Sequence, residues 1–256
     1  MKDANAPELL AAKLLFANKP ALATDALAAA LRRSFSQVDN ADNSHTYLFP
    51  DYPVTFADGK QVSASLMLTS AERPSGTNTL AAALQQTWHW QEAATFIADC
   101  RHEVIVTDFM TRTLPYKVRV ELFQKALDCF VRALQPRALY FVGSSKLVEP
   151  QAYLERGRAL LEGLMNVRFY TIADSPNQEM LLDTLGLPDF QIRFAGLDPN
   201  KVVGLLTSYG YYLFENGLVI EDGNTIAGLP RGAKWTCRHT DALLEPARLV
   251  IELDTN

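Results

Sequence analysis

Cysteines, long apolar runs and basic clusters are scarce in this 256-residue sequence. Its three cysteines, at positions 100, 129 and 237, lack the short spacings of a disulfide framework or a zinc ribbon. The longest apolar stretch free of charged residues, from Val202 to Phe214, is too short to span a bilayer. The first sixteen residues lack the basic segment and the continuous apolar core of a secretory signal peptide. We therefore expect a cytoplasmic protein that folds without a metal, cofactor or disulfide and contacts no membrane.

Charge and composition narrow the class of protein further. The 24 Lys and Arg residues against 29 Asp and Glu residues give a net charge of −5, and no basic run is available to bind a phosphate backbone. A hydrophobic fraction of 48% and a charged fraction of 21% are typical of a globular protein and exclude disordered and collagen-like chains. This balance disfavours a nucleic-acid ligand and suits a basic protein partner.

Short catalytic motifs are missing as well. The sequence contains no glycine-rich dinucleotide or phosphate loop, no G-x-S-x-G elbow and no H-E-x-x-H pair. Their absence lowers the expectation of an enzyme without excluding one.

The first half of the sequence predicts alternating strands and helices. Apolar runs indicate strands at 14–16, 104–106 and 138–142, and helical spacing indicates helices at 24–35, 79–98 and 118–134. Thr24 and Asp25 are the expected N-terminal cap of the first helix. Alternation from Val54 to Leu68 around the pair Asp58-Gly59 is typical of a hairpin.

The second half is richer in predicted strands. These lie at 167–172, 190–194, 234–238 and 248–253, with a further strand and turn within 180–189. Asp198-Pro199 and Gly217 are typical start and stop signals for a helix between them. The whole chain is therefore predicted to be α+β, with two abutting sheet-and-helix units of mostly antiparallel strands, residues 1–165 and 166–256, packed as one globule.

Several segments of the second half resemble a bacterial family known as domain of unknown function 4261. The resemblance lies in residues 168–172, 180–189, 197–200, 220–228, 234–237 and 241–246. Relative to the family pattern, Asn224 stands where a histidine is typical and His239 where an aromatic residue is usual. The resemblance therefore supports the fold prediction but implies neither an activity nor histidine-dependent chemistry in this loop.

A repeated Cys-Arg-His tripeptide, at 100–102 and 237–239, is the most unusual local feature. On two adjacent strands it would offer two thiolates and two imidazoles to zinc. The first copy falls at the end of a predicted helix, however, and structural zinc sites use shorter ligand spacings. We therefore expect half-buried cysteines beside surface histidines and no metal site.

Two carboxylates follow predicted strands, where α/β enzymes often place catalytic groups. Asp108 follows the strand at 104–106, and Glu149 follows the strand at 138–142. A helix cap or a strand-end turn explains each of them equally well.

The loop at 221–225 gathers Glu221, Asp222 and Asn224 beside a glycine. Such residues form turns because their side chains bond nearby backbone amides. A binding role stays open if Asp183 and Asp189 are spatial neighbours, since a polar rim suits binding better than chemistry.

Trp88 and Trp90 cannot share one helical face, so we expect one in the core and the other partly exposed. Because an exposed tryptophan often anchors an interface, we include Trp90 among the binding residues.

These observations predict a non-enzymatic protein that binds a basic protein partner, either as an adaptor or as an immunity protein that neutralises a secreted bacterial toxin. The expected binding residues are Asp183, Asp189, Glu221, Asp222, Asn224 and Trp90. The oligomeric state stays open.

The alternative is an enzyme or small-ligand receptor with a cleft between the two halves. Its polar groups would be Asp108, Asp183 and Asp222. A water-excluding pocket with perturbed carboxylates would favour this alternative, whereas a flat acidic face would favour protein binding.

Overall fold

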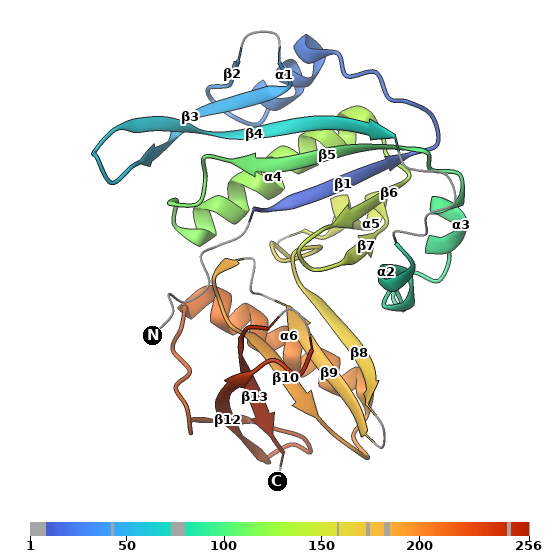
Figure 1. The fold of residues 1–256 in the computed structure, drawn as a ribbon, viewed down its shortest axis with the longest axis vertical. Helices are drawn as coiled ribbons and strands as arrows, with labels where there is room; N and C mark the ends of the chain where they lie inside the picture. The colour runs from blue at the N-terminus through green and yellow to red at the C-terminus, as the bar shows by residue number, and fades with distance from the viewer. Residues whose placement is uncertain are drawn as a thin grey trace. The chain divides into compact units, whose positions relative to one another are not determined.

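A computed structural model describes residues 9–41, 44–72, 80–157, 159–172, 175–181, 185–244 and 247–255. The chain forms two compact units, an N-terminal unit (9–163) and a C-terminal unit (164–256), and each combines a β-sheet with helices (Figure 1). The predicted α+β class with mostly antiparallel strands is thus confirmed. Within the described ranges no helix is both long and apolar enough to cross a membrane.

The sheet of the N-terminal unit has seven strands in the order β2-β3-β4-β5-β1-β6-β7, and every neighbouring pair is antiparallel. The strands are β1 (Ala11–Phe16), β2 (Asp39–Asn40), β3 (Thr46–Thr55), β4 (Gln61–Glu72), β5 (His102–Phe109), β6 (Ala138–Phe141) and β7 (Lys146–Val148). The predicted hairpin is confirmed as β3 and β4, joined by a turn in which Gly59 has a φ of 81°.

Five described helices accompany this sheet. They are α1 (Thr24–Arg32), α2 (Ala81–Gln85), α3 (Ala93–Ala98), α4 (Tyr116–Leu134) and α5 (Pro150–Glu155). Helix α4 runs along one face of the sheet (Figure 1). Its Phe130 ring packs against Tyr47 of β3. The opposite face, at the β1 and β6 end, is covered by α2 and α3, whose buried residues pack with Leu15 and Ala138.

Two local predictions for this unit are wrong. The helix expected at 79–98 is two short helices, because the chain turns between them and carries Trp90 into the core beneath α2 and α3. The expected side-chain cap of α1 is absent: Ala23 is the N-cap, and the Thr24 hydroxyl instead lies 3.3 Å from Nδ1 of His45.

The sheet of the C-terminal unit has six strands in the order β11-β12-β13-β10-β9-β8. The strands are β8 (Asn166–Ile172), β9 (Ser175–Leu181), β10 (Asp189–Arg193), β11 (Thr225–Ala227), β12 (Lys234–Asp241) and β13 (Leu249–Asp254). Only the β10–β13 pair is parallel among the described pairings. The strand expected within 180–189 is β9, which begins and ends earlier than predicted.

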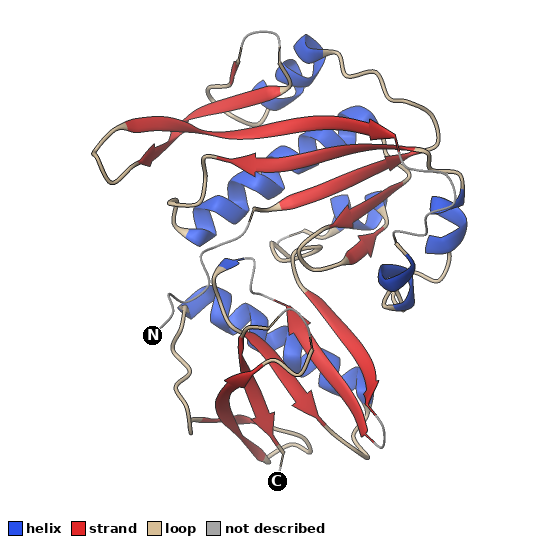
Figure 2. Cartoon of the chain, in the orientation of Figure 1, coloured by secondary structure: helices blue, strands red, loops and turns tan. Residues whose placement is uncertain are grey.

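Helix α6 (Pro199–Asn216) packs on this sheet (Figure 2). Its predicted boundaries are confirmed, since Oδ1 of Asp198 accepts a hydrogen bond from the Asn200 amide at 2.9 Å and Gly217 is the C-cap with a φ of 77°. The core of the unit includes the fully buried rings of Phe190, Phe214 and Trp235.

Candidate functional site

An apolar groove lies on the C-terminal unit where the segment before β10, the segment after α6 and the start of β13 meet. Its cavity volume is about 240 Å³, and its apolar lining includes Leu187, Leu218, Ile220, Leu249 and Val250. Leu187, Ile220 and Val250 form a buried floor. By contrast, Leu218 is 62% exposed and Leu249 is 53% exposed. The side chains of Leu218 and Leu249 therefore expose apolar surface to solvent beside the groove.

A buried ion pair joins two of the groove walls. Nε of Arg248 donates to Oδ2 of Asp189 at 2.6 Å, and both side chains are almost fully buried. Asp189 also lies opposite Val250 in the parallel pairing of β10 and β13. The carboxylate therefore fixes the segment before β10 against the segment before β13, and Asp189 lies inside the unit rather than on its surface.

The polar loop forms the third wall through bonds within its own turn. The Glu221 amide donates to Oδ1 of Asn224 at 3.1 Å, and the Asn224 amide donates to the Glu221 carbonyl at 3.0 Å. Oδ1 of Asp222 accepts from the His239 amide of β12 at 2.8 Å. Asn224 thus holds the turn, as local chemistry predicts, whereas Asp222 ties the turn to β12. The exposed Glu221 lines the groove.

The groove suits binding better than covalent chemistry. His239 at its edge directs Nε2 to the carbonyl of Ile220 at 3.0 Å. The neighbouring Cys237 of β12 is buried, and burial raises the pKa of its thiol to about 11, so the nucleophilic thiolate is scarce at neutral pH. An apolar hollow edged by exposed carboxylates matches the usual anatomy of a contact surface, with an apolar centre and a polar rim.

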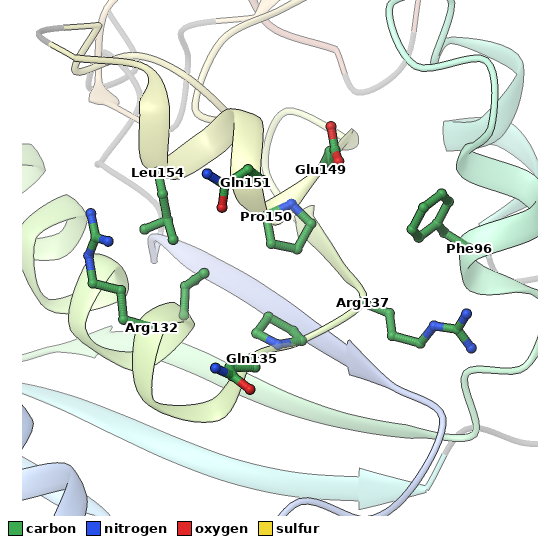
Figure 3. A pocket seen from close by; sticks show the side chains of 10 residues that line it. Phe96, Arg132, Gln135, Arg137, Glu149, Pro150, Gln151 and Leu154 are labelled. Atoms are coloured by element: carbon green, nitrogen blue, oxygen red, sulfur yellow. The ribbon is translucent and has the colours of Figure 1, made fainter.

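A second hollow lies on the N-terminal unit between α3, the end of α4 and the start of α5 (Figure 3). Its cavity volume is about 620 Å³. Glu149, the N-cap residue of α5, stands at its rim, so this one of the two predicted strand-end carboxylates does face a cavity. Arg132 and Arg137 lie at opposite ends of the hollow (Figure 3).

Asp108 lies in a closed polar cluster. Oδ1 accepts from the Leu10 amide at 2.6 Å, while Oδ2 accepts from Nε of Arg119 at 2.6 Å and from the Thr111 hydroxyl at 2.5 Å. All three polar side chains are buried. The carboxylate oxygens are therefore engaged in holding α4 and the turn after β5, which favours a structural role.

The other sequence-based site residues are dispersed. Trp90 is the buried tryptophan at 8% exposure and Trp88 the exposed one at 48%, so the choice of Trp90 as a surface anchor needs correction. The reason is the break between α2 and α3, which turns Trp90 into the core. Asp183 lies outside the described residues. Glu221 lines the groove, Asp222 and Asn224 lie in the same loop, and Asp189 is buried next to the groove residue Pro188.

The two Cys-Arg-His tripeptides belong to different units, and each cysteine is buried. Over the described ranges, no three His, Cys, Asp or Glu side chains gather in a way that could hold a metal ion.

The apolar lining of the groove was missed by sequence reasoning. The apolar run from Leu218 to Ile220, directly after the helix-terminating Gly217, is the signal that could have revealed it. Pattern alone does not show that the first two of these side chains are exposed while the third is buried.

Comparison with known families finds one domain of unknown function, DUF4261, whose model matches residues 182–254. The matched segment contains the whole lining of the groove and the Asp189–Arg248 pair. No curated protein and no solved structure matches the chain.

Proposed function

We propose that the protein binds a basic protein partner through the apolar groove of the C-terminal unit. One observation carries the proposal: the two most exposed large apolar side chains among the described residues, Leu218 and Leu249, flank the same hollow. Exposed apolar surface that gathers around a concave site is typical of an interaction surface. An apolar anchor of the partner would fill the hollow and cover both leucines.

Charge supports a basic partner. Glu221 lines the groove, Asp222 lies beside it, and the chain carries a net charge of −5. Lys or Arg residues next to the partner's anchor would meet these carboxylates at the rim. Such charges chiefly accelerate association, and their effect weakens as salt screens it.

A protein of this kind would act as an adaptor or as an immunity protein that neutralises a secreted toxin. Buried cysteine thiols suit a reducing compartment, which supports a cytoplasmic location.

The test uses the tagged full-length chain to recover partners from the native host. We expect the wild-type chain to retain a basic protein, and the double variant Leu218→Asp/Leu249→Asp to lose it while keeping the wild-type melting temperature. Phe56→Asp/Val62→Asp is the matched control, because it places the same two charges on exposed apolar positions of the other unit. Retention by the groove variant, or equal loss with the control variant, would refute the assignment to this groove.

The rim is tested by association kinetics with the recovered partner. Glu221→Lys should slow association by roughly two- to tenfold at low ionic strength and much less at high salt. Glu121→Lys on α4 makes the same charge change at an exposed position of the other unit and serves as the control. A screen for hydrolase and transferase activity completes the test: robust turnover without a stable partner would favour the enzyme alternative.

A further inference from the structure

The hollow of the N-terminal unit has an apolar lining of its own. Val131 and Pro136 are buried at its base, and Phe96, Pro150 and Leu154 complete the apolar part of the lining. With a volume of about 620 Å³ it can accept several side-chain-sized groups. Phe96 is among the exposed large apolar residues of the chain.

The charge of this hollow is opposite to that of the chain. Its lining includes Arg132 and Arg137 against the single carboxylate of Glu149, whereas the chain as a whole is acidic. Among the described residues no carboxylate lies within 4.0 Å of the Arg132 guanidinium. Nη1 of Arg137 is 3.7 Å from Oδ2 of Asp99, whose side chain is 75% exposed. The Arg132 guanidinium is therefore available to an anionic ligand, and Arg137 can exchange its solvent-exposed contact with Asp99 for one.

The positions of the two arginines define the shape of that ligand. In Figure 3 they lie at the two ends of the hollow and point away from each other, with Pro150 between them and Gln135 near the base. An extended segment with carboxylates on either side of an apolar residue would reach both arginines and bury its apolar side chain between them.

We propose that this hollow docks an acidic segment of a partner protein, with an apolar side chain on the floor and a carboxylate at each arginine. Guanidinium groups suit this role because they donate two parallel hydrogen bonds to one carboxylate. The surface is separate from the C-terminal groove and has the opposite charge preference. The chain thus carries two docking surfaces, one for a basic partner and one for an acidic segment, as an adaptor requires.

The test uses fluorescent peptides and the full-length chain. The probe is Glu-Glu-Leu-Glu-Glu, compared with Gln-Gln-Leu-Gln-Gln by fluorescence anisotropy at low ionic strength. We expect the acidic peptide to bind roughly tenfold more tightly than the neutral one. Arg132→Glu and Arg137→Glu should each weaken binding by roughly three- to tenfold, and Glu149→Gln should strengthen it about twofold.

Arg33→Glu on the C-cap of α1 is the matched control and should leave binding unchanged. Arg132→Gln and Arg137→Gln provide milder variants if charge reversal disturbs folding. The C-terminal double variant Leu218→Asp/Leu249→Asp should bind the acidic peptide normally, so that failure of one surface is separable from failure of the other. Equal binding of neutral and acidic peptides, equal weakening by Arg33→Glu, or equally tight binding of free glutarate would each overturn the proposal.

Discussion

Arg248 and Asp189 are 59 positions apart in the chain, yet Nε of Arg248 lies 2.6 Å from Oδ2 of Asp189 in the interior of the C-terminal unit. Arg119 and Asp108 make a buried pair with the same atoms and the same distance in the N-terminal unit. Each unit therefore uses a buried guanidinium and carboxylate to hold a sheet strand to another segment of the chain.

Asp189→Asn should lower the free energy of unfolding by about 3–5 kcal/mol, because it leaves the buried charge of Arg248 without a carboxylate. Urea unfolding measures the loss. The control is Arg193→Gln, which breaks the pair of Arg193 and Glu252 at 2.7 Å, where the arginine is largely solvated; it should cost less than about 1 kcal/mol. Equal losses in the two variants would contradict a special role for the buried pair.

His89 should make the protein less stable in mild acid. Burial foremost, and then the charge of Lys146, lower the pKa of His89 below its ordinary 6.5, and Nε2 bonds the Leu147 carbonyl at 2.8 Å. Between the lowered pKa and 6.5 the unfolded chain binds more protons than the folded one, so stability is complete above 6.5 and falls as the pH drops.

Urea midpoints at about pH 7.5 and about pH 5.5 test this expectation. A fully buried group changes stability by at most about 1.4 kcal/mol per pH unit, and His89, which is partly solvent-exposed, should contribute less. His89→Gln keeps a donor for the Leu147 carbonyl but does not titrate in this range. Its midpoint should therefore fall less than that of the wild type. An equal fall of the urea midpoint in both proteins would show that His89 does not cause the loss of stability in acid.

Gly163→Ala should destabilise the N-terminal unit far more than Gly157→Ala. Both glycines have positive φ angles, 83° and 61°, so both substitutions strain the backbone by about 1–2 kcal/mol. At Gly163 the new Cβ would also lie 2.2 Å from Cε2 of Phe141, a buried ring, whereas nothing lies within 4 Å at Gly157. We expect a total loss of about 3 kcal/mol or more at Gly163. Similar melting temperatures for the two variants would show that the Phe141 ring can move away.

Trp90→Ala should cost about 3–5 kcal/mol of unfolding free energy, because its ring is buried between α2 and α3. Trp88→Ala removes an exposed ring that makes an edge-on contact with His89, and should cost less than about 1 kcal/mol. Denaturant unfolding of the two variants distinguishes the core tryptophan from the surface one. The opposite order of losses would reverse the assignment.

Elements that depend on neighbouring residues were predictable. The β3–β4 hairpin follows from alternating apolar residues around Asp58-Gly59, and α6 follows from Asp198-Pro199 and Gly217, because a turn and a cap are built within a few residues. The division of 79–98 into α2 and α3 was not predictable in this way. There the burial of Trp90 against the sheet outweighs the helical preference of an alanine-rich segment.

The candidate site also combines features that could be predicted from neighbouring residues with features that could not. The turn at Glu221–Asn224 was expected, because Asx side chains bond amides a few positions away. The ion pair between Asp189 and Arg248 was not expected, because only the parallel pairing of β10 with β13 brings these two residues together. Exposure of Leu218 and Leu249 likewise depends on which faces the sheet and α6 leave uncovered.

Composition and local backbone preferences were enough to predict the α+β class, the hairpin, the limits of α6 and the acidic balance of the chain. Only the three-dimensional fold reveals which carboxylates are buried with arginines, whether Trp88 or Trp90 is exposed to solvent, and where apolar and charged side chains gather into hollows. These features join residues far apart in the chain, such as Leu187 and Leu249 around one hollow or Arg137 and Pro150 around the other. Their proximity depends on strand order and helix packing, which no short stretch of sequence specifies.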